Sequence, residues 1–422
     1  MRVISVYYHR HSNTEPVFVG RLVHDEGLSH FEYDAGFLAL GLNMSPFKLE
    51  MHGLLQSAPS HPFSGLHGLF NDSLPDGWGM YLMDKDFKNH GISLDDIYPI
   101  DRLAYMGSRA MGALSYLPDD GNKFHSASRK AKTEQLNLNQ LAKESINLYT
   151  GEIDEVLSHL AINGTPSGGA RPKVLLGLKG KETISGAYDL PEGFEHWLAK
   201  FPTGTNAEDK AEGSIEYLYS IMARQAGIDF PETKLVAGEN GNAYFLIKRF
   251  DRAEGNKRIH MQTLAGLVNA DFRVADFDYD RLLKVCSAIT KSHKEVSQLF
   301  KRMLFNVMSG NRDDHTKNFS FLMDDNGIWR NSPAYDFTFN RGINGEHSML
   351  VGKSGKNITQ DDIALLAKTA SLKNKEVQYM IDEVSEELSS WKNEALNYNI
   401  PKSRVIEISD YMERQRKQLI TK

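Results

Sequence analysis

An aspartate and an asparagine at a spacing suited to phosphoryl transfer stand three quarters of the way along the chain. Asp313 precedes Asn318 by five positions, and the apolar run Phe319–Met323 directly after them reads as a strand. In phosphotransferases with this spacing the aspartate orients the attacking hydroxyl and the asparagine holds magnesium. Residues 324–327 then predict a hairpin turn before a short strand, and Asp336 follows where a second metal-binding aspartate is expected. Such amide and carboxylate oxygens suit Mg2+, which takes a few protein oxygens plus phosphates.

The motif by itself leaves other readings open. Asp313, Asp314 and His315 also fit a turn capped by an aspartate, or part of a metal site in a hydrolase. The order of the other segments favours phosphoryl transfer, because the chain supplies the further parts that this chemistry needs.

A glycine-containing loop is the second candidate segment. It consists of Gly168, Gly169, Ala170, Arg171, Pro172 and Lys173. Its small residues let backbone N–H groups approach phosphate oxygens, and Arg171 and Lys173 add positive charge. The loop matches neither a Walker A sequence nor the usual G-x-G-x-x-G, so a plain hairpin turn is the alternative reading.

A lysine and a glutamate follow in the order that a kinase needs. The strand predicted at 196–202 alternates so that Lys200 faces away from its apolar side chains, which suits contact with phosphates. A helix is predicted at 212–227, where Glu216 or Glu212 is placed to pair with Lys200. An exposed strand lysine and a solvated helix glutamate are the alternatives.

An apolar strand is predicted from Ala243, and charged residues follow it directly from Lys248 onward. In a kinase the two lobes meet at this point, and backbone groups of the hinge hold the adenine. The hinge candidates are Lys248, Arg249 and Phe250.

The rest of the chain predicts the elements that position these residues. Residues 1–40 alternate apolar and polar side chains over short runs, which is typical of antiparallel strands. The Leu-Pro-Asp sequence at 74–76 breaks the backbone before a helix that runs through Phe87. A further helix, a glycine turn and a strand are predicted over 102–116, and a polar linker over 118–132.

Helical periodicity dominates the remainder. One helical stretch is predicted at 136–160, and after Leu264 the pattern is helical almost throughout, broken only by the catalytic segment and residues 342–357. An apolar helix at 297–309 leads directly into the loop that holds Asp313. Further helices are predicted at 361–367, 376–391 and 405–420.

Composition is that of an ordinary globular protein. The 422 residues exceed the length at which one core stops growing, and 41% of them are hydrophobic and 25% charged. Cys286 is the only cysteine, which excludes an internal disulfide and is compatible with the cytoplasm. No run of about 18 uncharged apolar residues predicts a membrane span. With a net charge of -6, nucleic acid is expected to be bound only through a basic partner.

Taken together, these segments resemble the HipA family of bacterial Ser/Thr kinase toxins of type II toxin–antitoxin systems. The segments similar to that family are 168–173, 249–252, 310–320 and 333–336, joined in the N-terminal part by 70–79 and 107–114. The resemblance implies an α+β, bilobal protein-kinase-like fold. Its N-terminal lobe is mixed α/β with an extra N-terminal subdomain, and its C-terminal lobe is all-α.

The resemblance also implies domain limits. Residues 1–125 correspond to the N-terminal subdomain and 126–422 to the kinase region. Within the latter, about 135–256 form the ATP-binding part and about 257–422 the mainly helical lobe.

Roles for single residues follow from the same resemblance. Asp313 is expected to be the catalytic aspartate, Asn318 and Asp336 the magnesium ligands, and Lys200 the lysine that contacts the phosphates of ATP. The remaining residues expected to contact the nucleotide are Gly168, Gly169, Ala170, Arg171, Lys173, Lys248, Arg249, Phe250, His315 and Lys317.

In this family a serine of the glycine loop is autophosphorylated, which ejects the loop and inactivates the kinase. Here Pro166 stands where that serine is common. Ser167 is therefore the first candidate for autophosphorylation and Thr165 the second.

The resemblance further implies a helix-turn-helix antitoxin as partner, with operator DNA bound only through that complex. The expected substrate is a host protein, such as an aminoacyl-tRNA synthetase, whose phosphorylation causes growth arrest and persistence. Two alternatives stay open. A small-molecule phosphotransferase shares the D-x4-N motif, but lacks the glycine loop and N-terminal segments. A pseudokinase serving as a corepressor scaffold is disfavoured by the complete set of Lys200, Asp313, Asn318 and Asp336.

Overall fold

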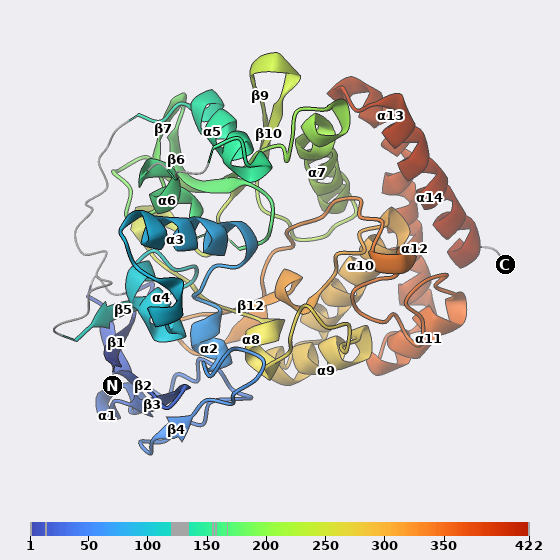
Figure 1. Cartoon of the computed structure of the whole chain (residues 1–422). Coiled ribbons are helices and arrows are strands. Elements are labelled where there is room, and N and C mark those ends of the chain that lie inside the picture. The colour runs from blue at the N-terminus through green and yellow to red at the C-terminus, as the bar shows by residue number, and fades with distance from the viewer. Residues whose placement is uncertain are drawn as a thin grey trace.

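The chain was analysed as a computed structural model, which describes residues 2–12, 15–119, 135–153, 156, 158–166 and 168–420. Figure 1 shows an N-terminal part in blue, a second part built on a sheet in green, and a C-terminal lobe of helices in yellow to red. Most of the linker expected at 118–132, and the expected division between residues 125 and 126, lie outside the described residues.

The N-terminal part is built on an antiparallel sheet with the strand order β4-β3-β2-β1-β5. Its strands are β1 (Arg2–Tyr8), β2 (Val17–Asp25), β3 (Leu28–Tyr33), β4 (Gln56–Ser57) and β5 (Leu114–Pro118). Alternate side chains of β1, those of Ile4, Val6 and Tyr8, are fully buried, as the period-two pattern predicts. The antiparallel strands expected in the first 40 residues are confirmed.

The N-terminal part also contains the helices α1 (Ala35–Leu38), α2 (Gly68–Asn71), α3 (Gly77–Asn89) and α4 (Pro99–Met106), with a short 3-10 turn η1 (Leu94–Asp96). Helix α4 packs against β1, β2 and β5 (Figure 1). Helix α3 begins directly after its N-cap residue Asp76, whose backbone is extended. Pro75 disfavours helical backbone at Leu74, which keeps a helix from running into this point from the N-terminal side. The predicted order of helix, glycine turn and strand over 102–116 is present as α4 and β5.

The second part carries an antiparallel sheet with the order β7-β6-β8-β10-β9. Its strands are β6 (Lys173–Lys179), β7 (Glu182–Ser185), β8 (Glu195–Lys200), β9 (Thr233–Ala237) and β10 (Ala243–Lys248). Helices α5 (Leu138–Thr150), α6 (Ser158–Gly164) and α7 (Ala207–Gln225) accompany it. Trp197, Ala199 and Phe201 are fully buried on one side of the sheet, as predicted for this strand.

Two helix predictions in this part were wrong in their limits. The single helix expected at 136–160 is two helices, because Gly151 takes a left-handed conformation (φ +79°) that ends α5. The helix expected at 212–227 begins earlier, at Ala207, since the Asn206 side chain caps it by accepting from the N–H groups of Glu208 and Asp209.

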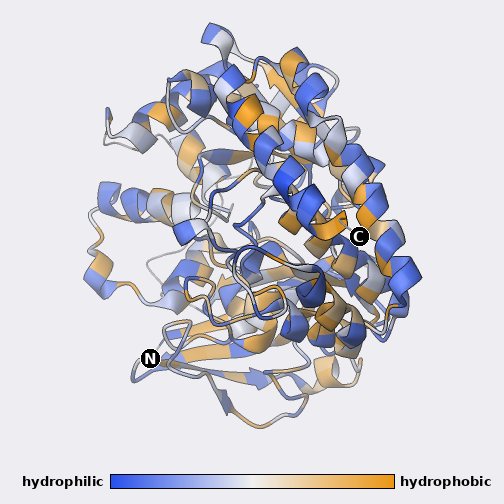
Figure 2. Cartoon of the chain, turned by 90° about the vertical axis from the view of Figure 1, so that its right-hand side faces the viewer, coloured by the Kyte–Doolittle hydropathy of each residue, from blue (hydrophilic) through white to orange (hydrophobic). Residues whose placement is uncertain are grey.

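The C-terminal lobe is helical, as predicted, apart from one small sheet. Its helices are α8 (Leu264–Val268), α9 (Tyr279–Thr290), α10 (His293–Ser309), α11 (Gln360–Thr369), α12 (Asn374–Ser389), α13 (Trp391–Glu394) and α14 (Lys402–Ile420). The sheet joins β11 (His260–Thr263), β12 (Ser320–Met323) and β13 (Trp329–Asn331) in that order, which confirms the predicted hairpin after Asn318. Figure 2 shows hydrophobic and hydrophilic residues interleaved along the outer helices, as expected of helices with one face in the core.

Helix α3 of the N-terminal part packs into the core of the second part. Its residues Trp78 and Leu82 belong to the apolar core of the second part, where they pack with Leu160, Val174 and Trp197. In the described part of the chain, no helix has both the length and the apolar character needed to span a bilayer.

Candidate active site

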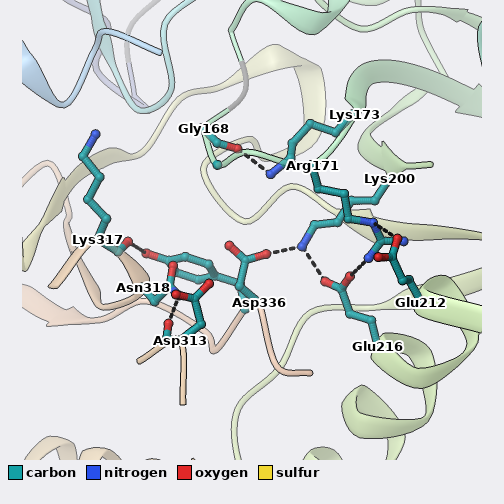
Figure 3. A network of polar contacts seen from close by, with 12 residues as sticks. Gly168, Arg171, Lys173, Lys200, Glu212, Glu216, Asp313, Lys317, Asn318 and Asp336 are labelled. Carbon is teal, nitrogen blue, oxygen red and sulfur yellow. Dashed lines mark hydrogen bonds and ion pairs between the residues drawn. The ribbon is translucent and has the colours of Figure 1, made fainter. Parts of the chain in front are cut away.

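The loop that follows α10 carries the predicted catalytic residues. Gly310, at φ +77°, ends α10 and turns the chain into this loop. The side-chain amide of Asn318 donates to the backbone carbonyl of Asp313 at 2.5 Å, which closes the loop into a compact turn. Figure 3 shows Asp313, Asn318 and Asp336 next to one another.

Asp314 anchors this loop from within the lobe. Its carboxylate is buried and accepts from the hydroxyl of Tyr279 at 2.7 Å, from His347 Nδ1 at 2.8 Å and from the N–H of Ser348 at 2.9 Å. The two neighbouring aspartates thus have different surroundings, because Asp313 remains 54% exposed. His315 Nε2 lies 3.9 Å from the Asp313 carboxylate, and His315 Nδ1 accepts from the N–H of Lys317 at 3.2 Å.

Lys200 connects the sheet of the second part to the C-terminal lobe. Its ammonium group pairs with Glu216 on α7 and with Asp336, which lies just after β13 (Figure 3). Lys200 is 7% exposed and Glu216 2%. Asp336 holds the left-handed backbone conformation (φ +55°), an uncommon one for aspartate that marks many functional positions. Of the two glutamates proposed for Lys200, Glu216 makes the contact.

Nearby charges and burial shift the pKa values of the Asp336 and Asp313 carboxyl groups in opposite directions. Burial would raise the pKa of Asp336, but the cationic Lys200 and Lys173 hold this pKa well below its usual range. Partial desolvation raises the pKa of the Asp313 carboxyl even though its side chain is half exposed, the negative charge of Asp336 acts in the same direction, and the nearby His315 opposes both. Asp336 is thus ionised at neutral pH, as a magnesium ligand requires.

The side chain of Lys173 folds back onto the backbone of the glycine loop. Lys173 Nζ donates to the carbonyl oxygen of Gly168 (Figure 3), and a Cβ at Gly169 would lie 2.5 Å from that nitrogen. A side chain at Gly169 would therefore displace the ammonium group. Burial, together with the charge of Lys200, lowers the pKa of Lys173 to about 8.

Arg171 faces α7 instead of the catalytic loop. Its guanidinium donates to Glu216 at 3.0 Å and to the carbonyl of Phe201 at 3.0 Å, and it lies 3.3 Å from the carboxylate of Glu212. Thr165 is fully buried, while Ser167 lies outside the described residues.

The hinge candidates lie at the end of β10. The N–H of Arg249 donates to the carbonyl of His196 at 2.9 Å, and its buried guanidinium pairs with Asp251 at 2.7 Å. Lys248 pairs with Glu195 near the surface. The Phe250 ring lies 5.6 Å from that of Tyr335, beside the catalytic segment. The Phe250 ring thus faces the catalytic segment, whereas the side chains of Lys248 and Arg249 pair with Glu195 and Asp251.

One site contact was missed by the sequence analysis. Asp76, at the start of α3, pairs with Lys317 Nζ at 2.8 Å and accepts from the N–H of Gly169. Residues 74–76 were recognised only as a helix start, and the sequence spacing gives no signal for a contact with residue 317, which lies 241 positions away.

The donor set fits magnesium and a polyphosphate. Lys173 and Lys200 supply positive charge beside Asp336, while Lys317 pairs with Asp76. Asn318 and Asp336 offer one amide oxygen and one carboxylate. Magnesium is usually held by one or two protein carboxylates and by phosphates, so this small oxygen set suits it. Within the described residues there is no cluster of three or more His, Cys, Asp or Glu that would hold a metal by itself.

The two lobes, the lysine–glutamate pair and the Asp-x4-Asn loop define a protein-kinase-like fold. Models of the HipA family match most of the chain: the HipA N-terminal domain matches residues 13–117, and the HipA-like C-terminal domain matches residues 165–392. The chain therefore belongs to the HipA family.

Similar proteins agree with this assignment. A putative kinase of Haemophilus influenzae is 31% identical over 135 residues, which cover 29% of this chain and 39% of that protein. Putative kinase Y4dM of Sinorhizobium fredii is 28% identical over 228 residues, covering 49% of this chain and 53% of its own length. The chain thus matches about half or less of these curated relatives.

Among solved structures, the chain resembles HipA in the complex of the Shewanella oneidensis MR-1 toxin–antitoxin system with HipB and its operator DNA. The TM-score is 0.63 at 16% identity, and the match covers 96% of this chain and 95% of the other. This likeness extends the family fold over nearly the whole chain.

Proposed function

We propose that this chain is a Mg-ATP-dependent serine/threonine protein kinase of the toxin type. The observation that carries the proposal is the bridge from Glu216 through Lys200 to Asp336, beside Asp313 and Asn318. A lysine held by a helix glutamate next to a metal-binding aspartate is the arrangement that positions ATP in kinases.

Each residue takes a definite task in this proposal. Asp313 orients the substrate hydroxyl and accepts its proton. Lys173, Lys200 and Lys317 bind the phosphates. Asn318 and Asp336 would hold magnesium, which neutralises charge on the transferred group. Phe250 would contact the adenine, with Lys248 and Arg249 forming the hinge.

The proposed biological role is growth arrest by phosphorylation of a host protein in the cytoplasm, an aminoacyl-tRNA synthetase being the first candidate. A helix-turn-helix antitoxin neutralises the kinase, and operator DNA is bound only through the antitoxin. Membership of the HipA family supports this role, as does the likeness in fold to a HipA solved with HipB and operator DNA.

The test is phosphate transfer from labelled Mg-ATP by the purified chain. Asp313→Ala should lower turnover by at least about 10^2-fold, the usual scale of a general-base contribution, while ATP affinity stays close to that of the wild type. Asp410→Ala, which removes an exposed carboxylate on α14, is the matched control and should leave turnover unchanged. Undiminished transfer in Asp313→Ala would contradict the proposal.

A further inference from the structure

Asp76 brings a carboxylate from the N-terminal part into the candidate phosphate site. Its side chain is 12% exposed and that of Lys317 14%. One oxygen of Asp76 pairs with Lys317 Nζ at 2.8 Å, and the other accepts from the N–H of Gly169. Both partners are residues for which a contact with nucleotide phosphates is proposed.

Helix α3 is held against the glycine loop by backbone and Trp78 contacts, which place the Asp76 side chain beside its two partners. The N–H of Trp78 donates to the carbonyl of Gly169 at 2.9 Å, and Trp78 Nε1 donates to the carbonyl of Lys173 at 3.0 Å. A Cβ at Gly77 would lie 2.6 Å from the Gly169 carbonyl oxygen, so the two backbones are in direct contact. Trp78 is also part of the core of the second part, so this backbone contact is anchored in packed apolar side chains.

The chemistry of the contact is that of phosphate binding. A phosphate group is typically held by backbone N–H groups of a glycine loop and by a lysine ammonium group. Asp76 engages one donor of each kind with its two oxygens. Figure 3 shows the Lys317 side chain extending away from Asp313 and Asp336, so its ammonium group is drawn off from the site by this contact.

Asp76 carries its negative charge at neutral pH. Burial alone would raise the pKa of this carboxyl, but the charge of Lys317 and the hydrogen bonds from Lys317 and Gly169 hold it below its ordinary value. A phosphate that approached the same donors would meet a like charge and would compete for them.

We propose that Asp76 is an internal anion of the phosphate site, which occupies Lys317 and the Gly169 N–H until the triphosphate of ATP displaces it. The N-terminal part thereby sets the nucleotide affinity of the kinase region. This inference rests on the proposed function, since it assumes that the same donors bind phosphates. The opposite role, in which Asp76 holds the loop ready for ATP, predicts the opposite sign in the test.

The test compares Asp76→Asn with the wild-type full chain for binding of Mg-ATP and of inorganic tripolyphosphate by calorimetry. Asparagine keeps an oxygen for Gly169 but removes the charge that pairs with Lys317. Affinity for both ligands should rise by about 3- to 10-fold, which is less than the effect of losing one full charge-assisted hydrogen bond, because the asparagine amide still competes for the same donors. Asp84→Asn, on the same helix but paired with Arg102, is the matched control and should change affinity by less than about twofold.

A second arm isolates Lys317. Lys317→Gln should lower tripolyphosphate affinity more in the Asp76→Asn background than in the wild type, because only there is the ammonium group fully available. If Asp76→Asn melts below the wild type, Asp76→Ser provides a second uncharged variant that keeps a hydroxyl oxygen at this position.

The outcomes separate the two proposals. Weaker binding of both ligands by Asp76→Asn, or equal effects of Lys317→Gln in both backgrounds, overturns the inference. The inference is also overturned if neither ligand binds to Asp76→Asn. Tighter tripolyphosphate binding without any Mg-ATP binding supports the inference and contradicts the kinase proposal.

Discussion

Lys200 forms an ion pair with Asp336, and through it a strand of the second part reaches the C-terminal lobe. The same ammonium group pairs with Glu216 on α7, so one side chain joins three segments of the fold. Because Asp336 is the expected magnesium ligand, nucleotide binding and the contact between the two lobes share this residue. Measuring both the stability of the fold and the affinity for Mg-ATP should therefore show, for each of Lys200, Glu216 and Asp336, whether the residue supports the fold, binds nucleotide, or does both.

Asp336→Asn should act mainly on nucleotide binding. The amide keeps the size of the side chain but loses the charge that a magnesium ligand supplies, so Mg-ATP affinity should fall at least about tenfold. The melting temperature without nucleotide should shift less than in Glu216→Gln, because the Asp336 side chain is 34% exposed and Lys200 keeps Glu216 as its partner. Calorimetry and thermal melting on the same sample measure both. A loss of stability that matches the loss of affinity would make Asp336 a structural residue.

Glu216→Gln should act on stability. Glu216 is 2% exposed and pairs with both Lys200 and Arg171, so its loss takes a charged partner from the buried Lys200 and from the partly buried Arg171. Breaking a buried pair in this way typically costs about 3–5 kcal/mol. The matched control is Glu212→Gln, since Glu212 is 31% exposed, lies on the same helix and also contacts Arg171. An exposed pair contributes about 0–1 kcal/mol, so urea unfolding should separate the two variants clearly.

The elements around the site could be predicted because their signals are local. The strand that presents Lys200, the hairpin after Asn318 and the apolar helix before Gly310 each follow from periodicity and turn residues within about 15 positions. Helix limits were less well predicted: Gly151 ends α5 through its own backbone conformation, and the Asn206 cap starts α7 five residues early.

The contacts that set the charge of the site could not be predicted in the same way. Asp76 and Lys317 are separated by 241 positions, and their contact exists only because Trp78 buries α3 in the core of the second part. The buried guanidinium of Arg249 pairs with Asp251, two residues away, and the expected role of this residue in a nucleotide-binding hinge stays a prediction. Which buried charges pair depends on how distant segments pack in three dimensions, and sequence spacing alone does not predict that packing.

Nucleotide affinity should fall at alkaline pH through Lys173. Burial lowers the pKa of this lysine to about 8, so its ammonium group loses its proton as the pH rises above that value. Phosphate oxygens bind the protonated form, and affinity should therefore be highest below about pH 8 and decline as the pH rises to about 9.5. Titration calorimetry with Mg-ATP across this range measures the decline. Lys173→Met should bind more weakly and show a flatter profile, and an unchanged profile would contradict the role of Lys173.

Autophosphorylation should fall on Ser167 before Thr165. Thr165 is fully buried, and its hydroxyl has no hydrogen-bond partner among the described residues, so a kinase would reach it only after the glycine loop opened. A phosphate on this loop adds about -1.5 to -2 charges close to Arg171 and Lys173 in the sequence, and would compete with ATP for cations.

Prolonged incubation with Mg-ATP followed by mass spectrometry should find phosphate on Ser167, with kinase activity declining as it accumulates. Ser167→Ala should retain activity over the same period, and Thr165→Val, which preserves the shape of the buried side chain, should behave as the wild type. If neither residue is modified and activity persists, the chain has lost this means of self-inactivation. Restraint by a bound partner would then be the remaining means of control.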